Sequence, residues 1–329
     1  MIRVPNREGS VGVNKSRKKS PFQANSRQSE ICPICDGTSE LIFLKKGYPI
    51  RDCLACSHRF AQIEAAQHHV ERVYADHYFK GTGPGYADYL TDGELLISHG
   101  RRYARILSRY MNLGSVLDVG AAAGFILKGF EEIGWKGAGI EPNSAMAEHA
   151  RRRLGVMVET GTLEDSPSNG RYDVIAMIQI VAHFVDPRRA LDVASKMTKP
   201  GGYWLIEAWN RKSWTARILG EAWHEYSPPS VLHWFSIETL GELVQDFGLQ
   251  EIARGRPTKW ISPTHAKLIA QSELGGSVLG KLITSVTKLI PERLPLPYML
   301  DDVFWALYQR PEAGCTGDRT TQAKTGSPG

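Results

Sequence analysis

Four of the five cysteines stand in two closely spaced pairs. Cys32 and Cys35 form one C-x2-C motif, Cys53 and Cys56 form another, and seventeen residues separate the pairs. Each motif lets two thiolates converge from one tight turn, and a hairpin between them can bring all four together. Four sulfur ligands with no open position are typical of structural zinc. A single motif could be a redox dithiol, but two at this spacing favour a zinc ribbon over residues 30–62.

A second candidate site lies in the stretch VLDVGAAAGF, where an apolar strand pattern gives way to a helix pattern. Asp118 and Gly120 fall at the end of this first strand, where open α/β sheets bind their ligands. The dinucleotide pattern G-x-G-x-x-G fails, because its third glycine would fall at Phe125. There is also no Gly-Lys-Ser/Thr phosphate loop. The stretch instead fits D-x-G-x-G-x-G, with Ala122 at the middle glycine and Gly124 at the last.

The elements that would position these residues alternate from residue 115 onward. Strands separated by helix-length patterns indicate βαβ units and a parallel sheet. After a helix at 236–248, two more strands follow at 249–256 and 301–310, with a long insertion between them. The earlier expected strands cover 115–120, 137–143, 156–161, 172–180 and 201–209, and the expected helices cover 124–133, 144–154 and 187–197.

The loop and this order of elements resemble the class I S-adenosylmethionine-dependent methyltransferases, over most of the chain after residue 70. The resemblance implies an α/β fold with a Rossmann-like, seven-stranded, mostly parallel sheet whose last strand is antiparallel. It implies S-adenosylmethionine as the cofactor. Glu141 closes the second strand, where such enzymes hold both ribose hydroxyls with an acid, and Pro142 follows it. A carboxylate suits that role, because it only accepts hydrogen bonds and can satisfy two O–H donors.

The same resemblance implies the other cofactor contacts. Thr162 and Leu163 follow the third strand and would flank the adenine. Gln179 and Ile180 leave the fourth strand and would line the methionine side. Tyr78 belongs to a region that closes over the cofactor in such enzymes, so we include it among the expected contacts.

Ala122 bears on the choice of cofactor. A dinucleotide pyrophosphate lies against the loop backbone, so a side chain at the second glycine would obstruct it. The amino-acid end of S-adenosylmethionine is compact and should tolerate a methyl group there. This argument expects Ala122 to adopt a negative φ, while Gly120 and Gly124 keep the tight turn and the close helix contact.

A narrower resemblance follows from the order of the ribbon, YADHYF, the loop, SPPSVLHWFS and LDDVFWALYQR. It is similar to a bacterial group of zinc-ribbon methyltransferases that modify sugars and natural products. The implied function is O- or C-methyl transfer to a small-molecule acceptor. A second hypothesis is an RNA- or protein-modifying enzyme that uses the ribbon for recognition. A third is a non-catalytic binding protein, against which the retained Asp118 and Glu141 argue.

Transfer to a hydroxyl or a carbon acid needs a group that removes a proton. His183 follows the fourth strand and His233 follows the fifth, and histidine titrates in the useful range. A packed structural role is the alternative for His233, which precedes Trp234 and Phe235. The SPPS stretch at 227–230 is similar to a motif of N-methylating enzymes, but it follows the fifth strand and lacks the aromatic residue. We therefore disfavour nucleobase N-methylation.

Charge limits the choice of partner. The net charge is +5, but residues 1–29 hold seven Lys/Arg against one acid, a local +6, so the rest of the chain is close to −1. That remainder offers no basic surface for a polyanion, and we expect no nucleic-acid partner. No secretory leader and no bilayer-spanning apolar run is visible, so we expect a cytoplasmic protein.

The expected organisation has five parts. A disordered basic tail (1–29) precedes the ribbon, and a helical lead-in or lid (63–112) follows it. The methyltransferase domain covers 113–310 with an insertion at 257–300, and 311–329 is a disordered end. Inside the insertion, 277–290 has one apolar helical face. We expect a lid helix docked on its own domain, with membrane-surface or partner binding as the alternative.

Overall fold

The computed structural model describes residues 31–63, 69–75, 79, 89–167, 171–258, 260–261, 263, 294, 296–298 and 300–312. The expectations for the tail at 1–29, the helix at 277–290, Tyr78 and all but the first two residues of 311–329 lie outside the described residues. Within the described ranges, no helix is both long and apolar enough to cross a membrane.

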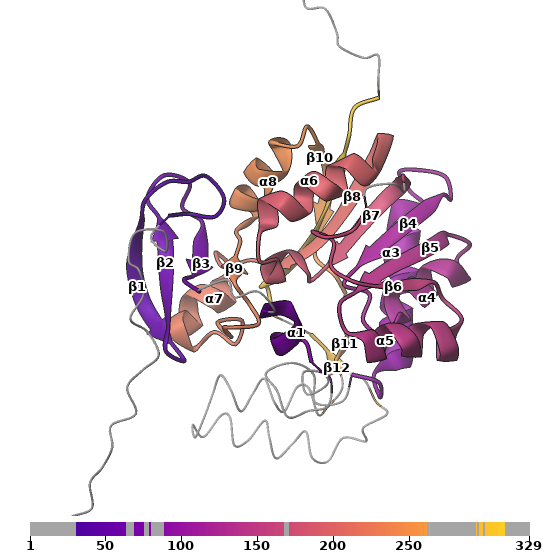
Figure 1. Cartoon of the computed structure of the whole chain (residues 1–329), viewed down its shortest axis with the longest axis horizontal. Helices are drawn as coiled ribbons and strands as arrows, with labels where there is room; N and C mark the ends of the chain where they lie inside the picture. The colour runs from indigo at the N-terminus through magenta and orange to yellow at the C-terminus, as the bar shows by residue number, and fades with distance from the viewer. Residues whose placement is uncertain are drawn as a thin grey trace, which may run out of the picture.

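The centre of the molecule is a seven-stranded sheet (Figure 1) in the order β10-β13-β8-β7-β4-β5-β6. Neighbouring strands from β6 to β8 run parallel, and β13 runs antiparallel to both β8 and β10. This confirms the expected mostly parallel sheet with an antiparallel last strand. The strands are β4 (Ser115–Val119), β5 (Lys136–Glu141), β6 (Val158–Thr160), β7 (Tyr172–Ile178), β8 (Thr198–Trp209), β10 (Gln250–Gly255) and β13 (Val303–Gln309).

Helices cover both faces of this sheet (Figure 1). Alternate residues of each strand point to opposite faces, so Leu117 packs in one core cluster with α6 and α8, and Val116 packs in another with α3 and α4. The helices are α1 (His69–Val73), α3 (Gly93–Leu107), α4 (Phe125–Glu132), α5 (Ser144–His149), α6 (Pro187–Met197), α7 (Trp214–Leu219) and α8 (Ile237–Gln245); the short turns are η2 (Ala150–Leu154), η3 (Val181–His183) and η4 (Gly220–Ala222).

Local sequence explains where the helices begin. Asp186 caps α6 by accepting a hydrogen bond from the Arg189 N–H at 2.9 Å, and Pro187 takes the first helical position. Ser236 and Thr239 form a reciprocal capping box at α8. These signals were readable in the sequence, and both helices begin within a residue of their expected starts.

Helices α3 and α4 pack unusually closely, because a glycine of each lies at the crossing. A Cβ atom at Gly100 would overlap the Ile126 carbonyl, and one at Gly129 would overlap the Ile97 carbonyl. This contact holds α3 down on the sheet, so that its Tyr103 reaches a strand end described below.

The N-terminal module is a small antiparallel sheet of β1 (Ser39–Lys45), β2 (Tyr48–Cys53) and β3 (Arg59–Ala61). Its fourth strand is β9 (His233–Trp234), which follows β8 of the central sheet in the chain. The ribbon expected over 30–62 thus shares a sheet with a strand of the main domain. A further two-stranded pair, β11 (Trp260–Ile261) and β12 (Leu296–Pro297), lies within the expected insertion.

Candidate active site

The loop after β4 turns as its glycines require. Gly120 and Gly124 have φ values of +71° and +81°, a region that suits glycine. Gly124 is the N-cap residue of α4, and a Cβ atom there would lie 2.7 Å from Val156 Cγ2 and 2.8 Å from Ala150 Cβ. It therefore permits close helix contact, as expected, although it does not line the cavity described below.

The expectation for Ala122 was wrong. Its φ is +46°, in the left-handed region, where we expected a negative value. The reason is a hydrogen bond: this conformation lets the Ala122 N–H donate to Glu141 Oε2 at 2.8 Å. Ala122 thus keeps the backbone of the glycine it replaces and accepts the strain of a Cβ atom.

Glu141 ends β5 and is buried. Its two oxygens accept hydrogen bonds from the N–H groups of Ala122 and Asn143, each at 2.8 Å. Burial raises the pKa of Glu141 to about 7, against the lowering effect of these two donors. Each oxygen keeps a further lone pair, so the carboxylate can also accept from two hydroxyl groups, as a ribose would require.

Asp118 is the residue that best tests whether the site fits a cofactor. Its side chain is only 2% exposed, and its Oδ2 atom has no hydrogen-bond partner. Burial, together with the nearby charge of Glu141, raises the pKa of Asp118 to about 8. A buried acceptor without a partner is costly and rare. Asp118 and Glu141 are two buried carboxyl groups beside one loop, and they suit a cofactor that brings hydroxyl donors and positive charge, as S-adenosylmethionine does.

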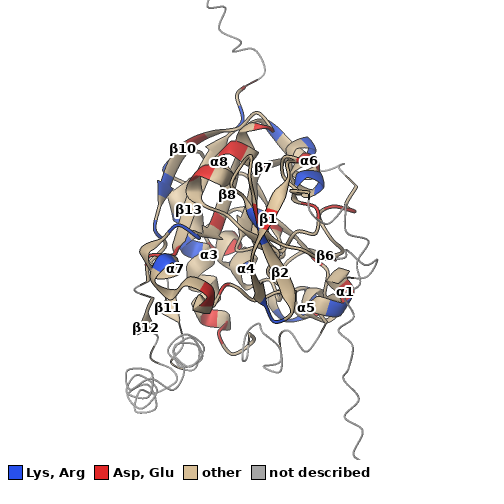
Figure 2. Ribbon diagram, turned by 90° about the vertical axis from the view of Figure 1, so that its left-hand side faces the viewer, with Lys and Arg blue, Asp and Glu red and all other residues tan. Residues whose placement is uncertain are grey.

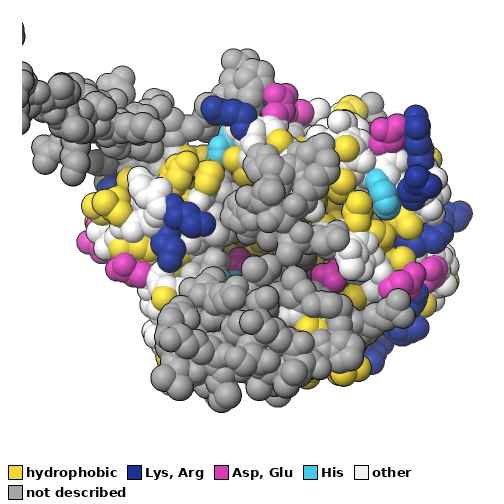
Figure 3. Space-filling view, turned by 90° about the horizontal axis from the view of Figure 1, so that it is seen from below, with side chains coloured by type: hydrophobic (Ala, Val, Ile, Leu, Met, Phe, Trp, Pro, Cys, Tyr) yellow, Lys and Arg dark blue, Asp and Glu magenta, His cyan; other side chains and the backbone are white. Residues whose placement is uncertain are grey.

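One cavity unites the expected cofactor residues at the carboxyl ends of the parallel strands. Figure 3 views the molecule from the α1 side and shows hydrophobic, acidic and histidine side chains among the described residues of this face. The sequence-predicted residues that line the cavity are Asp118, Gly120, Ala122, Glu141, Pro142, Thr162, Leu163, Gln179, Ile180 and His183.

The exit of β7 carries a network that sequence reasoning missed. Gln179 has a φ of +57°, and its Nε2 donates to Glu207 Oε1 at 2.7 Å. Tyr103 from α3 donates to the other oxygen of Glu207, which is 2% exposed and also lines the cavity. Because the Glu207 carboxylate only accepts, the Gln179 side-chain nitrogen must face it, and the side-chain oxygen Oε1 of Gln179 is left to accept from another group. The only sequence signal was an acid near the end of the fifth strand.

His183 is held in one tautomer at the cavity wall. Its Nδ1 atom and the Tyr74 hydroxyl each lie 2.8 Å from the Ser230 carbonyl oxygen and 2.9 Å from each other. Since a carbonyl only accepts, Nδ1 carries a proton and Nε2 is left able to accept one. Burial lowers the pKa of His183, although the bond to Ser230 opposes this, so the ring is neutral at pH 7.

His233 lies elsewhere. It is 3% exposed, with Nδ1 3.1 Å from His58 Nε2 and Nε2 3.0 Å from the Phe184 carbonyl oxygen. Burial lowers its pKa to about 4. It does not line the cofactor cavity. Both nitrogens are engaged in structural contacts, so the packed alternative fits His233, and we keep His183 alone as the candidate base.

Tyr74 is the lead-in residue that reaches both sides of the cavity. Its carbonyl oxygen accepts from the side chain of Asn143, at 2.8 Å, and Asn143 is two residues after Glu141. Its hydroxyl lies beside His183. Phe79, 7% exposed, lines the same cavity. Two lead-in residues near Tyr78 thus line the cavity, whereas Tyr78 itself lies outside the described part.

The four cysteines converge, and no disulfide joins them. Their sulfur atoms all lie within 4.8 Å of one another, with Cys32–Cys56 at 3.7 Å and Cys35–Cys53 at 3.4 Å. Zinc–thiolate bonds of about 2.3 Å in a tetrahedron require sulfur separations of about 3.7 Å, so this set fits a zinc ion. The two knuckles also share a geometry, because the residue after each motif, Asp36 or Ser57, has a positive φ.

The thiols are poised for a cation. Burial raises the pKa of Cys32 and raises that of Cys56 to about 12. Burial also opposes ionisation of Cys53, but N–H donors from Cys56 and Ala55 outweigh it and lower the pKa of Cys53 to about 7. Buried thiols of this kind ionise when a metal supplies the compensating charge.

Comparison with known proteins agrees with this geometry. Residues 95–253 match the family model described as a methyltransferase domain. A ubiquinone biosynthesis O-methyltransferase of Nitrobacter winogradskyi is 32% identical over 155 residues, which cover 44% of this chain and 59% of that protein. The chain thus spans little more than half the length of this relative. Residues 95–253 thus match a methyltransferase domain, and the strand order agrees with the class I S-adenosylmethionine-dependent fold that the loop motif predicted.

Solved structures with similar folds cover about two thirds of the chain. A possible histamine N-methyltransferase from Thermotoga maritima aligns at 20% identity with a TM-score of 0.45, over 68% of this chain and 92% of that one. The N-methyltransferase NodS of Bradyrhizobium japonicum, in complex with S-adenosylhomocysteine, aligns at 15% identity with a TM-score of 0.43, again over 68% and 92%.

Proposed function

We propose that this protein transfers a methyl group from S-adenosylmethionine to a hydroxyl oxygen of a small-molecule acceptor, of the sugar or secondary-metabolite class, with His183 as the general base. The observation that carries the proposal is the position of His183, beside the Ser230 carbonyl and at the wall of the cofactor cavity. Its Nδ1 lies 2.8 Å from the Ser230 carbonyl oxygen, to which it would donate, and His183 lines the same cavity as Asp118 and Glu141. A neutral imidazole beside the methyl donor can accept the proton that an attacking hydroxyl releases.

The residues divide the work among themselves. Glu141 would hold the ribose hydroxyls, and Thr162 and Leu163 would flank the adenine. Asp118 and Gln179 would face the methionine end. The cofactor supplies an electrophilic methyl group on a sulfonium, and the chain holds the acceptor oxygen in line with it and takes its proton. A carbon acceptor would need the same base, so the proposed role of His183 is the same for O- and C-transfer.

The similarity to ubiquinone biosynthesis O-methyltransferases supports oxygen as the methylated atom. The near-neutral charge outside the tail and the mixed charges of the ribbon side (Figure 2) support a small molecule over RNA. Four cysteines of this geometry support a structural zinc site. A modifying enzyme that recognises RNA or protein through its ribbon is the alternative.

Replacement of His183 by Asn tests the proposal. Asn keeps a hydrogen-bond donor for Ser230 but cannot accept a proton from the acceptor. We expect kcat to fall by roughly 10²- to 10⁴-fold and the affinity for S-adenosylhomocysteine, measured by calorimetry, to stay within twofold. Turnover is followed as S-adenosylhomocysteine formed from a panel of hydroxylated sugars and phenols.

His224→Asn is the matched control, because His224 is also half-buried but does not line the cavity. Full activity in His183→Asn would refute the assignment of the base. Methylation of RNA, with none on the panel, would favour the alternative function.

A further inference from the structure

We propose that the cysteine ribbon is a positioning element for His183. It holds the cavity wall at His183 through the segment 230–234, which we call the strap. In this proposal the ribbon is not a docking site for a partner. The proposal rests on the proposed function, in which His183 is the base. It names Arg59 of the ribbon as a positioning residue.

The first connection is made by backbone hydrogen bonds. Phe60 of β3 pairs with His233 of β9, and the next residue, Ala61, donates its N–H to the Leu232 carbonyl at 2.8 Å. Leu232 in turn donates its N–H to the Ala182 carbonyl at 2.8 Å. The ribbon, the strap and the turn η3 are therefore three consecutive hydrogen-bonded layers.

The second connection runs through side chains. His58 lies directly before β3, and its Nε2 is 3.1 Å from His233 Nδ1. The other nitrogen of His233 is 3.0 Å from the Phe184 carbonyl oxygen. The strap thus binds the carbonyls on either side of His183, at 182 and 184, and holds the His183 ring itself through Ser230. Three consecutive residues, of which His183 and Phe184 line the cavity, are therefore held by one segment.

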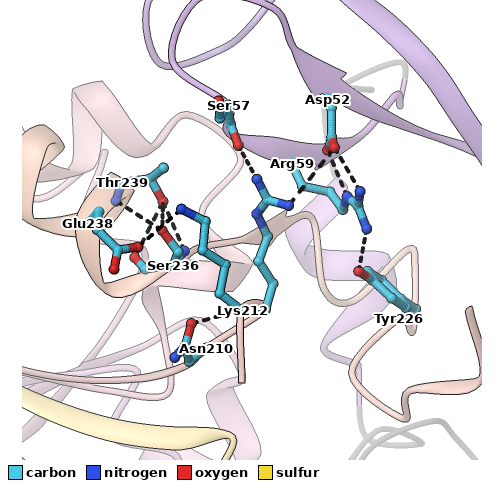
Figure 4. Close-up of polar contacts among 10 residues, drawn as sticks. Asp52, Ser57, Arg59, Asn210, Lys212, Tyr226, Ser236, Glu238 and Thr239 are labelled. Atoms are coloured by element: carbon cyan, nitrogen blue, oxygen red, sulfur yellow. Dashed lines mark hydrogen bonds and ion pairs between the residues drawn. The ribbon is translucent and has the colours of Figure 1, made fainter. Parts of the chain in front are cut away.

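Arg59 fastens the ribbon to the loop that leads into the strap (Figure 4). Its Nε donates to Asp52 Oδ1 and its Nη2 donates to Asp52 Oδ2, each at 2.7 Å, and Asp52 belongs to β2. Its Nη1 donates to the Tyr226 hydroxyl at 2.6 Å. The Arg59 and Asp52 side chains are 17% and 22% exposed, so this paired fork is far less screened than a surface ion pair. Arg211 adds a bond to the Ser57 carbonyl and lies 3.9 Å from Asp52.

The inner face of the ribbon is already covered by its own chain. Ile50 and Ala61 belong to one core cluster with Trp223, Leu232 and Trp234. A separate partner could reach this face only by displacing the strap. The turn that ends at Cys56 is followed three residues later by β3. The four-sulfur site therefore fixes the start of β3, which is hydrogen-bonded to the strap.

Arg59→Met tests the proposal without touching a cysteine. It keeps much of the side-chain volume but removes the fork to Asp52 and the bond to Tyr226. We expect at least tenfold faster amide hydrogen exchange at Leu232 and His183, and a rise in the pKa of the His183 ring, followed by NMR, toward its ordinary value as the wall loosens. Zinc content and the affinity for S-adenosylhomocysteine should stay within twofold. Arg59→Lys should be intermediate, because lysine cannot form the fork.

Arg188→Met is the matched control. Arg188 also joins the ribbon to the main domain, through the Ile34 carbonyl at 2.8 Å and Asp246 at 2.9 Å, but it contacts neither the strap nor η3. It should leave the exchange at His183 unchanged. Removal of zinc by a chelator should reproduce the faster exchange at Leu232 and His183 and the raised pKa of His183 that we expect for Arg59→Met.

Three outcomes would overturn the inference. Unchanged exchange and pKa at His183 in both Arg59→Met and chelated protein would show that the ribbon does not hold the wall. If Arg59→Met also lost affinity for S-adenosylhomocysteine, the ribbon would be shown to stabilise the whole domain and not to position His183. An equal effect of Arg188→Met would show that any ribbon contact suffices. Failure of the proposed function is distinguishable, because His183→Asn would then retain turnover whatever the exchange result.

Discussion

Ala122 is the residue at which function and stability conflict most plainly. A left-handed alanine costs about 1–2 kcal/mol relative to its usual conformations, and Ala122 holds a φ of +46°. The conformation persists because it aims the Ala122 N–H at Glu141. The loop therefore spends part of its stability on fixing the carboxylate that would hold the ribose.

Ala122→Gly should raise the free energy of unfolding by about 0.5–1 kcal/mol, since glycine adopts positive φ freely and the gain exceeds its extra unfolded-state entropy. Urea denaturation with unchanged m-value would measure this. Ala123→Gly is the control, because Ala123 is fully buried and has no positive φ, so the substitution should destabilise. A loss of stability in Ala122→Gly comparable to that in Ala123→Gly would contradict the strain argument.

Asp118 predicts a specific pH dependence of the cofactor-free protein. Its pKa is raised to about 8, so the folded state holds a proton that the unfolded state releases near pH 4. Between about pH 4 and pH 8, the contribution of Asp118 to the free energy of unfolding therefore falls as the pH rises, by at most about 1.4 kcal/mol per pH unit. Asp118→Asn should make this decline shallower between pH 6.5 and 8.5. Equal slopes in both proteins would show that Asp118 does not titrate there.

The sequence predicted the residues that lie at strand ends, and for a physical reason. Asp118, Glu141 and Gln179 follow apolar runs whose lengths fix where each strand stops, and parallel strands bring those ends together. Glu207 and Tyr103 could not be found this way. Tyr103 lies within the amphipathic pattern of α3, and its contact with Glu207 depends on how closely α3 and α4 approach.

At the scale of elements, hydrophobic periodicity and helix-capping residues predicted the long helices and strands well. The expected and observed bounds of α6 coincide at 187–197, and β8 extends only three residues before its expected start. The two-residue strand β9 and the turn η3 carry no periodic signal. Their conformations are set by partners far along the chain, so the four-stranded ribbon sheet could not be read from the cysteine spacing.

The ribbon itself should depend on metal. In Cys53→Ser we expect zinc content to fall from one ion per chain to none, and the thermal midpoint to fall by about 5–10 °C, because a closed structural site contributes folding free energy directly. Plasma emission spectrometry and calorimetry would measure the two effects. Cys315→Ser, outside the two motifs, should change neither. Normal zinc in Cys53→Ser would refute the four-thiolate site.

At the scale of the whole molecule, charge is separated along the chain. The basic tail carries the surplus, whereas Lys/Arg and Asp/Glu are interspersed over the described part on the ribbon side (Figure 2). Phosphate contacts need clustered cations. We expect any RNA binding to be weak, salt-sensitive and abolished when residues 1–29 are removed, as measured by fluorescence anisotropy. Tight binding that survives this deletion would favour the RNA-modifying alternative.

The shared sheet of β3 and β9 also has a consequence for how the protein is made. The first three ribbon strands leave the ribosome well before β9, whose partners in β3 lie about 170 residues earlier in the chain. Until then, the edge of β3 is an unpaired row of backbone donors and acceptors, open to misplaced pairing. The N-terminal module is therefore among the last parts to be completed, and early zinc capture would protect the nascent chain through this interval.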